Sequence, residues 1–168
     1  ATPSDIANNL PIIRPTVEKE IVDSIAQNTI TIIKTSSGQG KTTLALRAIS
    51  LLTEEYTPYQ ITKCNNDAEL GHIIEYFHMR TRIGEKPLIL LDNLDAHLSE
   101  WNLLAQLMQT GVTYHYKLLV TSRENDWYNY GGDISNLHHL NIIKPTLSEK
   151  EAESIYNALK KAEKIHED

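Results

Sequence analysis

The stretch that decides the fold is ITIIKTSSGQGKTTLAL, residues 30–46. It starts as an apolar, β-branched run, passes through a loop of small residues, and opens a helical pattern at Lys41. A strand, a glycine-containing loop and a helix in this order are the context in which a chain binds phosphate. The glycines let backbone N–H groups approach an oxyanion, and the helix N-terminus adds unpaired N–H groups and partial positive charge. The stretch therefore predicts a phosphate-binding loop.

Within this loop, Lys41 is expected to reach the β- and γ-phosphates of a nucleotide, and the Thr42 hydroxyl is expected to ligate Mg²⁺. The consensus G-x-x-x-x-G-K-[ST] has glycine at its first position, where this chain has Thr35. The alternative is a glycine-rich turn before an ordinary helix. The residues predicted to bind the cofactor are Thr35, Ser36, Ser37, Gly38, Gln39, Gly40, Lys41, Thr42 and Thr43.

Length and composition limit the class of protein. A chain of 168 residues can form one domain with a substantial core. No apolar run approaches the ~18–20 residues of a membrane span, so no membrane partner is expected. The formal net charge of −6 argues against nucleic acid as the main partner, because a phosphate backbone attracts clustered Lys and Arg. Cys64 is the single cysteine, so no disulfide forms within the chain and a cytoplasmic location is expected.

The order of the expected elements predicts the fold class. Apolar runs predict strands at residues 29–34, 59–64, 88–91, 116–121 and 140–143. Helical spacing predicts helices between them, one starting at Pro15, one at Lys41, one capped by Asp67, and one running from Leu94 to Met108. Residues 124–132 are expected to form a polar, aromatic loop. Alternating strands and helices indicate a parallel, doubly wound α/β sheet, in which ligands bind at the carboxyl ends of the strands.

A second motif follows the expected strand at 88–91, where Leu-Ile-Leu-Leu runs directly into Asp92. Four apolar residues ending in aspartate describe the Walker B pattern, and a carboxylate there can hold Mg²⁺ opposite the Thr42 hydroxyl. Asp95, three residues later, is expected to orient or polarise an attacking water. The alternatives are a helix N-cap for Asp92 and a solvated first-turn carboxylate for Asp95.

A third motif ends the expected strand at 116–121, where the chain continues Thr121-Ser122-Arg123. A strand that ends in this way would bring a hydroxyl and a guanidinium to the γ-phosphate. Arginine suits that task because its planar donors match phosphate oxygens. The alternative is an exposed arginine on a loop, paired with Glu124 or Asp126.

Together, the motifs at residues 35–43, 92–95 and 121–123 resemble the nucleotide-binding core of STAND NTPases, which are signal-transducing ATPases with numerous domains. Order and spacing match over about residues 12–165, and NACHT and NB-ARC modules are related. Ser-Arg-Glu with Trp127 shortly after it resembles the bacterial subset, some of which act in antiphage defence. The resemblance implies a P-loop NTPase sheet of the ASCE type, with five parallel strands in the order 5-1-4-3-2 and helices on both faces.

The same resemblance implies roles for residues and segments. The cofactors would be ATP or ADP with Mg²⁺, and Ile13 and Arg14 would lie near the adenine. Residues 1–14 would be an N-terminal arm, 15–146 the NTPase core, and 147–168 the truncated start of a following helical domain. The implied metal ligands are Thr42 and Asp92, and the implied catalytic residues are Lys41, Asp95 and Arg123.

The implied function is a regulatory switch with slow ATP hydrolysis. ATP with Mg²⁺ would favour an open, oligomerising state and ADP a closed one, so the partners would be nucleotide, other domains of a longer protein and further copies of it. A turnover enzyme, either a motor ATPase or a small-molecule kinase, is the alternative. A third possibility is a scaffold that binds nucleotide without hydrolysing it.

Overall fold

The computed structural model describes residues 15–36, 40–110 and 116–145. The predicted arm, the predicted helical segment at 147–168, and residues Ser37, Gly38 and Gln39 of the loop lie outside the described part of the chain. The elements in chain order are α2 (Pro15–Gln27), β1 (Ile30–Thr35), α3 (Lys41–Ser50), β2 (Thr57–Gln60), α4 (Asp67–Arg82), β3 (Pro87–Leu91), the 3₁₀ helix η1 (Ala96–Leu98), α5 (Trp101–Gln109), β4 (Lys117–Arg123), α6 (Glu124–Tyr130) and β5 (Leu140–Ile143).

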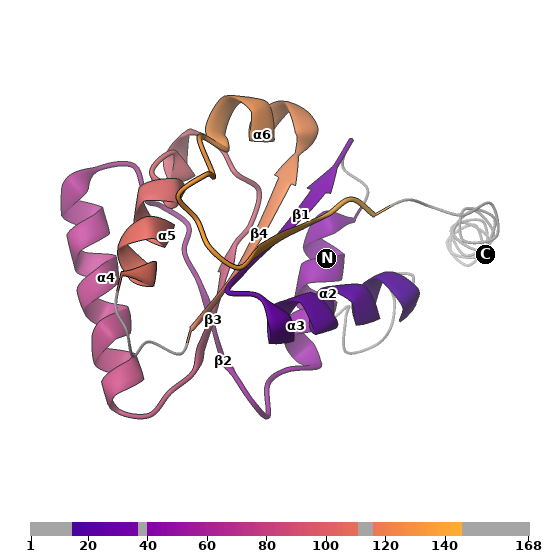
Figure 1. Cartoon of the computed structure of the whole chain (residues 1–168), viewed down its shortest axis with the longest axis horizontal. Helices are drawn as coiled ribbons and strands as arrows, with labels where there is room; N and C mark the ends of the chain where they lie inside the picture. The colour runs from indigo at the N-terminus through magenta and orange to yellow at the C-terminus, as the bar shows by residue number, and fades with distance from the viewer. Residues whose placement is uncertain (1–14, 37–39, 111–115, 146–168) are drawn as a thin grey trace, which may run out of the picture.

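The five strands form one parallel sheet in the order β2-β3-β4-β1-β5, which confirms the predicted order. β4 lies between β1 and β3, although it follows them both in the chain. Figure 1 shows the sheet in the middle of the molecule, with α4 and α5 on one side and α2 and α3 on the other. The three strands that carry the predicted motifs are therefore direct neighbours.

Helices cover both faces of the sheet, as predicted, because alternate residues of each central strand point to opposite faces. In β3, Leu88 and Leu90 pack in the cluster that includes α2 and α3, whereas Ile89 and Leu91 pack in the cluster that includes α4 and α5. All five residues of β3 are buried. A strand that is apolar at every position is what a parallel sheet covered on both faces requires.

Two predicted boundaries were wrong. The second strand occupies Thr57–Gln60 instead of residues 59–64, and Pro58 is tolerated inside it because β2 is an edge strand. The predicted helix from Leu94 to Met108 is interrupted, since Leu94 donates its backbone N–H to the carbonyl of Thr121 and η1 precedes α5. Leu94 is nevertheless buried, so its apolar character reflects core packing outside any helix.

Two further predictions were wrong, one about a helix cap and one about a loop. Asn66, and not Asp67, caps α4, and its side chain accepts from the Glu69 backbone N–H at 3.0 Å. The predicted loop at 124–132 is largely the helix α6. A seven-residue helix is marginal by itself. Here the indole Nε1 of Trp101 donates to the carbonyl of Tyr130 at 2.9 Å, so α6 depends on its contact with α5.

No helix among the described residues is long and apolar enough to cross a membrane.

Alanine substitutions at Gly71, inside α4, and at Gly131, directly after α6, should change the free energy of unfolding in opposite directions. A Cβ at Gly71, inside α4, would meet no atom within 4 Å, so Gly71→Ala should raise the free energy of unfolding by about 0.5–1 kcal/mol. A Cβ at Gly131 would lie 2.5 Å from the carbonyl oxygen of Trp127, so Gly131→Ala should lower it by about 1–3 kcal/mol. Urea denaturation measures both, and equal shifts in the two variants would contradict the packing described for α6.

Candidate functional site

The carboxyl ends of β1, β4 and β3 meet at one edge of the sheet. In the parallel register Thr35 lies opposite Arg123, and Leu91 lies opposite Val120. Asp92, the next residue after Leu91, therefore comes level with Thr121. This register brings the three sequence motifs together at the place where ligands bind in such sheets.

A hydrogen bond joins the first two motifs. The hydroxyl Oγ1 of Thr42, in the first turn of α3, lies 3.0 Å from both Oδ1 and Oδ2 of Asp92, and it donates to that carboxylate. The two residues are 50 positions apart in the chain. A hydroxyl and a carboxylate in contact are the oxygen ligands that Mg²⁺ takes alongside the phosphates of a bound nucleotide.

The third motif reaches the same carboxylate. The hydroxyl of Thr121 donates to Asp92 Oδ1 at 2.6 Å and accepts the backbone N–H of Asn93 at 2.7 Å. The sequence motif at 121–123 did not predict this contact between Thr121 and Asp92. The signal was present in the register, because a residue that follows Leu91 in β3 must face a residue that follows Val120 in β4.

Lys41 lies beside this cluster and is buried, with only 6% of its surface exposed. Burial lowers the pKa of its ammonium group, and the positive charge of Arg123 lowers this pKa further. The carboxylates of Asp92 and Asp126 act in the opposite direction. A buried ammonium group and a nearby guanidinium group form a site suited to an anion with several negative charges.

The backbone before Lys41 has the conformation that a phosphate loop needs. Gly40 has φ +73°, in the left-handed region, and its carbonyl accepts the Leu44 N–H at 2.9 Å as α3 begins. Nothing lies within 4 Å of a Cβ built on Gly40, so the requirement for glycine is conformational. The first N–H groups of an α-helix have no partner within the helix, so those at the start of α3 are suited to an anion.

Arg123 ends β4, is exposed, and is the N-cap residue of α6. Beyond it, the indole of Trp127 lies 5.9 Å from Nζ of Lys34 and 5.7 Å from the ring of Trp101. The carboxylate of Asp126 partly opposes the lowering of the Lys41 pKa. Sequence reasoning missed this connection because it treated residues 124–132 as a loop.

Asp95 has a structural role in addition to the predicted catalytic one. Its Oδ1 accepts the His97 backbone N–H at 2.8 Å at the start of η1. The segment is held to the loop after β2, since Glu100 donates its N–H to the Cys64 carbonyl at 3.0 Å and Cys64 donates to His97 O. The role of Asp95 in hydrolysis stays a prediction.

Some of the remaining predicted residues are described by the structure, and the others lie outside the described residues. Thr35 is buried at the end of β1, Ser36 is exposed after it, and Thr43 is half-buried in α3. Ile13 and Arg14, predicted near the adenine, lie outside the described residues, as do three positions of the loop: Ser37, Gly38 and Gln39.

The site fits a nucleotide with Mg²⁺. Within residues 15–36, 40–110 and 116–145, no group of three or more His, Cys, Asp or Glu side chains could hold a metal ion alone. Mg²⁺ commonly binds through one or two carboxylates together with substrate phosphates and water, so the Thr42–Asp92 pair is sufficient on the protein side. Lys41 and the start of α3 would meet the phosphates.

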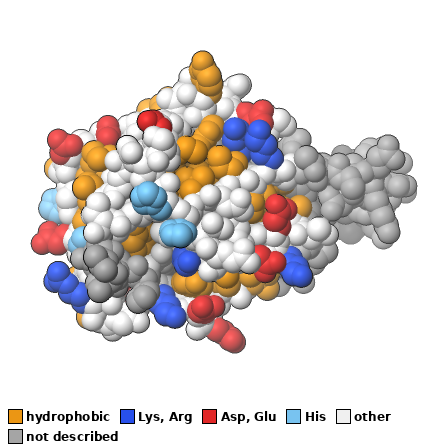
Figure 2. Space-filling view, viewed as in Figure 1, with side chains coloured by type: hydrophobic (Ala, Val, Ile, Leu, Met, Phe, Trp, Pro, Cys, Tyr) orange, Lys and Arg blue, Asp and Glu red, His pale blue; other side chains and the backbone are white. Residues whose placement is uncertain are grey.

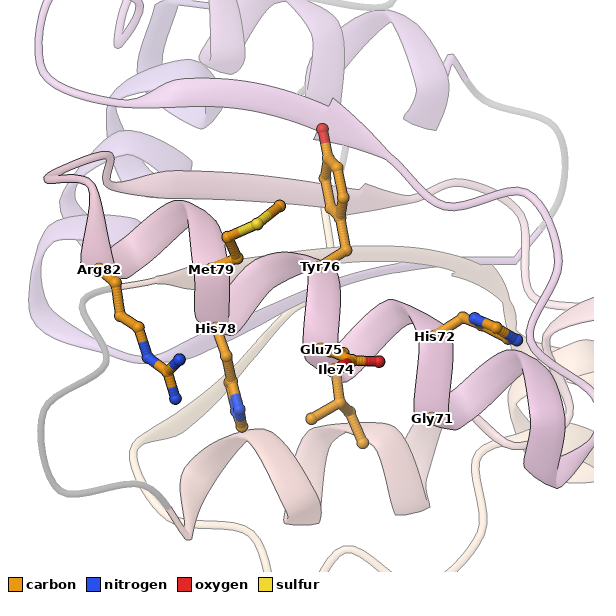
Figure 3. Close-up of a pocket in the computed structure, with 8 residues that line it drawn as sticks. All are labelled: Gly71, His72, Ile74, Glu75, Tyr76, His78, Met79 and Arg82. Carbon is orange, nitrogen blue, oxygen red and sulfur yellow. The ribbon is translucent and has the colours of Figure 1, made fainter.

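A cavity of about 670 Å³ lies elsewhere, along the outer side of α4. Figure 3 shows that all its labelled lining residues come from this one helix, with Tyr76 and Met79 on one side and Ile74 and His78 on the other. These side chains diverge and include no predicted site residue, so the cavity is separate from the cluster around Asp92.

Comparisons with known proteins identify a sequence family and a shared fold. The sequence model of the family described as novel STAND NTPase 5 matches residues 3–135. The fold is similar to the crystal structure of Saccharomyces cerevisiae RIF2, with a TM-score of 0.57, 10% identity, and coverage of 91% of this chain and 64% of that one.

A second structural match is a STAND protein with a tetratricopeptide repeat sensor from Pyrococcus horikoshii. Its TM-score is 0.52 and its identity 16%, with coverage of 90% of this chain and 26% of that one. This chain therefore spans less than two thirds of the length of each structure. No curated protein sequence matches it.

The hydrogen bond with which Asp95 caps η1 can be tested separately from the predicted role of Asp95 in hydrolysis. Asp95→Ala should lower the free energy of unfolding by about 1 kcal/mol, because the His97 N–H loses its acceptor, whereas Asp95→Asn should stay within about 0.5 kcal/mol. Asn66→Ala, which removes the observed cap of α4, is the matched control and should resemble Asp95→Ala. If Asp95→Asn is as destabilised as Asp95→Ala, the side chain does more than accept this hydrogen bond.

Proposed function

The chain belongs to the novel STAND NTPase 5 family, a family of nucleotide-binding modules, and we propose that it is the ATP-dependent switch of a signalling protein. The single observation that carries the proposal is the hydrogen bond from Thr42 to Asp92. It joins the start of the phosphate-loop helix to the end of β3. An ordinary glycine-rich turn before a helix would not explain why a carboxylate from another strand meets the hydroxyl directly after Lys41.

The proposed contacts follow from this geometry. Lys41 and the N–H groups at the start of α3 bind the β- and γ-phosphates, while Thr42 and Asp92 hold Mg²⁺. Bound Mg²⁺ supplies positive charge that offsets charge developing on the phosphate oxygens. Asp95 accepts a proton from, or orients, the attacking water, and Arg123 contacts the γ-phosphate.

A switch needs contacts that differ between its two nucleotide states. Arg123 is suited to this because it is exposed at the end of β4 and is followed directly by α6. A γ-phosphate that attracts the guanidinium would change the position of α6, which contacts α5 through Trp101. We propose that ATP favours an open, oligomerising state in a longer protein, that ADP favours a closed one, and that antiphage defence is the setting.

The alternative enzymes receive less support from the described residues. A nucleic-acid motor needs clustered positive charge, and on the face in Figure 2 the Lys and Arg side chains are interspersed with acidic ones. A small-molecule kinase needs an acceptor pocket beside the γ-phosphate, and the cavity described on α4 is not such a pocket, because none of the site residues lines it. A scaffold without hydrolysis would release phosphate from ATP no faster than a Lys41→Met protein does.

Replacing Lys41 tests the binding site. Lys41→Met should weaken ATP and ADP binding about 10- to 100-fold, because charge-assisted hydrogen bonds of about 1.5–3 kcal/mol are lost. Calorimetry measures both affinities. Lys117→Met is the matched control, since burial also lowers the pKa of Lys117, but this lysine lies at the opposite end of β4 and donates to Asn28 O.

Wild-type affinity in Lys41→Met would refute the assignment of the phosphate loop. Equal loss in both lysine variants would indicate a general loss of structure and would likewise argue against a specific role for Lys41.

A further inference from the structure

We infer that Thr121 is the positioning residue that fixes the Asp92 carboxylate for metal binding. The inference rests on the proposed function, because it assigns Asp92 to a nucleotide-bound Mg²⁺. It adds a residue outside the phosphate loop and identifies β4 as the element that orients the ligand at the end of β3.

The direction of the hydrogen bonds of Thr121 is determined by proton count. A threonine hydroxyl has one proton and accepts with its lone pairs. The Asn93 backbone N–H, 2.7 Å away, can only donate to it. The hydroxyl proton is therefore available for Asp92 Oδ1 at 2.6 Å, and the side chain is held in one orientation.

Thr121 contacts three successive residues of the turn after β3. Its hydroxyl bonds Asp92 and Asn93, and its carbonyl accepts the Leu94 N–H at 3.1 Å. Asn93 has φ +63°, a left-handed conformation that asparagine adopts more readily than most residues other than glycine. The bonds from Thr121 hold this turn in place, and the turn follows directly on the carboxylate of Asp92.

The two hydroxyls on Asp92 are bound differently. The single proton of Thr42 is shared between Oδ1 and Oδ2, each at 3.0 Å, whereas the Thr121 contact is shorter and goes to Oδ1 alone. Thr42 is half-buried at the loop, and Thr121 is completely buried inside the sheet. Thr121 thus acts as the fixed support, and Thr42 keeps a lone pair for a metal ion.

This arrangement also connects the two halves of the site. Thr121 precedes Arg123 by two residues on the same buried strand. Any shift of β4 that follows from phosphate contact at Arg123 would move the support of the metal ligand as well. Removing a residue that hydrogen-bonds a metal ligand typically changes metal affinity about 10- to 100-fold.

The test compares Thr121→Val, which keeps the shape and removes the hydroxyl, with Thr121→Ser, which keeps the hydroxyl. The measured quantity is the ratio of ADP affinities in Mg²⁺ and in EDTA, by calorimetry on the full chain. Thr121→Val should reduce this ratio at least about tenfold while the EDTA affinity stays at the wild-type value, and Thr121→Ser should retain the ratio.

Thr31→Val is the matched control. Thr31 is equally buried in the neighbouring strand β1, and its hydroxyl bonds Ser24 at 2.8 Å instead of Asp92. This variant should lose stability but keep the Mg²⁺ ratio, which separates metal positioning from the general cost of removing a buried hydroxyl.

A wild-type ratio in Thr121→Val would overturn the inference and leave the proposed function intact. A reduced ratio of ADP affinities in Thr121→Ser would also overturn the inference. This measurement on the serine variant remains decisive if the valine variant does not fold. Nucleotide binding by the wild type without any Mg²⁺ enhancement would overturn the inference and the proposed Mg²⁺ ligands, and would leave the phosphate-binding loop intact. Absence of nucleotide binding in the wild type would overturn the proposed function itself.

Discussion

The candidate site depends on the carboxylate of Asp92, which accepts hydrogen bonds from the hydroxyls of two threonines. Thr42 comes from the first turn of α3 and Thr121 from the end of β4, and both lie within 3.0 Å of the same oxygen. The three residues belong to segments that are far apart in the chain. They meet because β4 inserts between β1 and β3, so the geometry of the site follows directly from the order of the sheet.

The core on both faces keeps this order in place. Each central strand contributes alternate side chains to the two clusters, and β3 is buried along its whole length. A one-residue slip of β3 against β4 would move every β3 side chain to the opposite face of the sheet. It would also separate Asp92 from Thr121. Burial and the positive charge of Arg123 also lower the pKa of Lys41.

Much of this arrangement could be predicted from sequence because it rests on strong local signals. The run from Leu88 to Leu91 is apolar throughout, and Gly40 next to Lys41 marks a turn that only glycine adopts freely. The errors arose where tertiary contacts decide the outcome. α6 is too short to be stable without Trp101, and Leu94 is apolar because it enters the core. Thr121 was missed as a support because its role appears only when two strands are placed in register.

In the proposed site, Thr42 and Asp92 hold the metal ion of a bound nucleotide, and Thr121 supports Asp92 from inside the sheet. The most direct measurement is an NMR spectrum of threonine methyl groups with ATP and Mn²⁺, a paramagnetic substitute that broadens nearby signals. We expect strong broadening of the Thr42 and Thr121 methyl signals. Little change is expected at Thr57, which starts β2 at the opposite end of the sheet, or at Thr81 near the end of α4. Equal broadening of all four signals, or broadening at Thr57 and Thr81 alone, would contradict the proposed metal site.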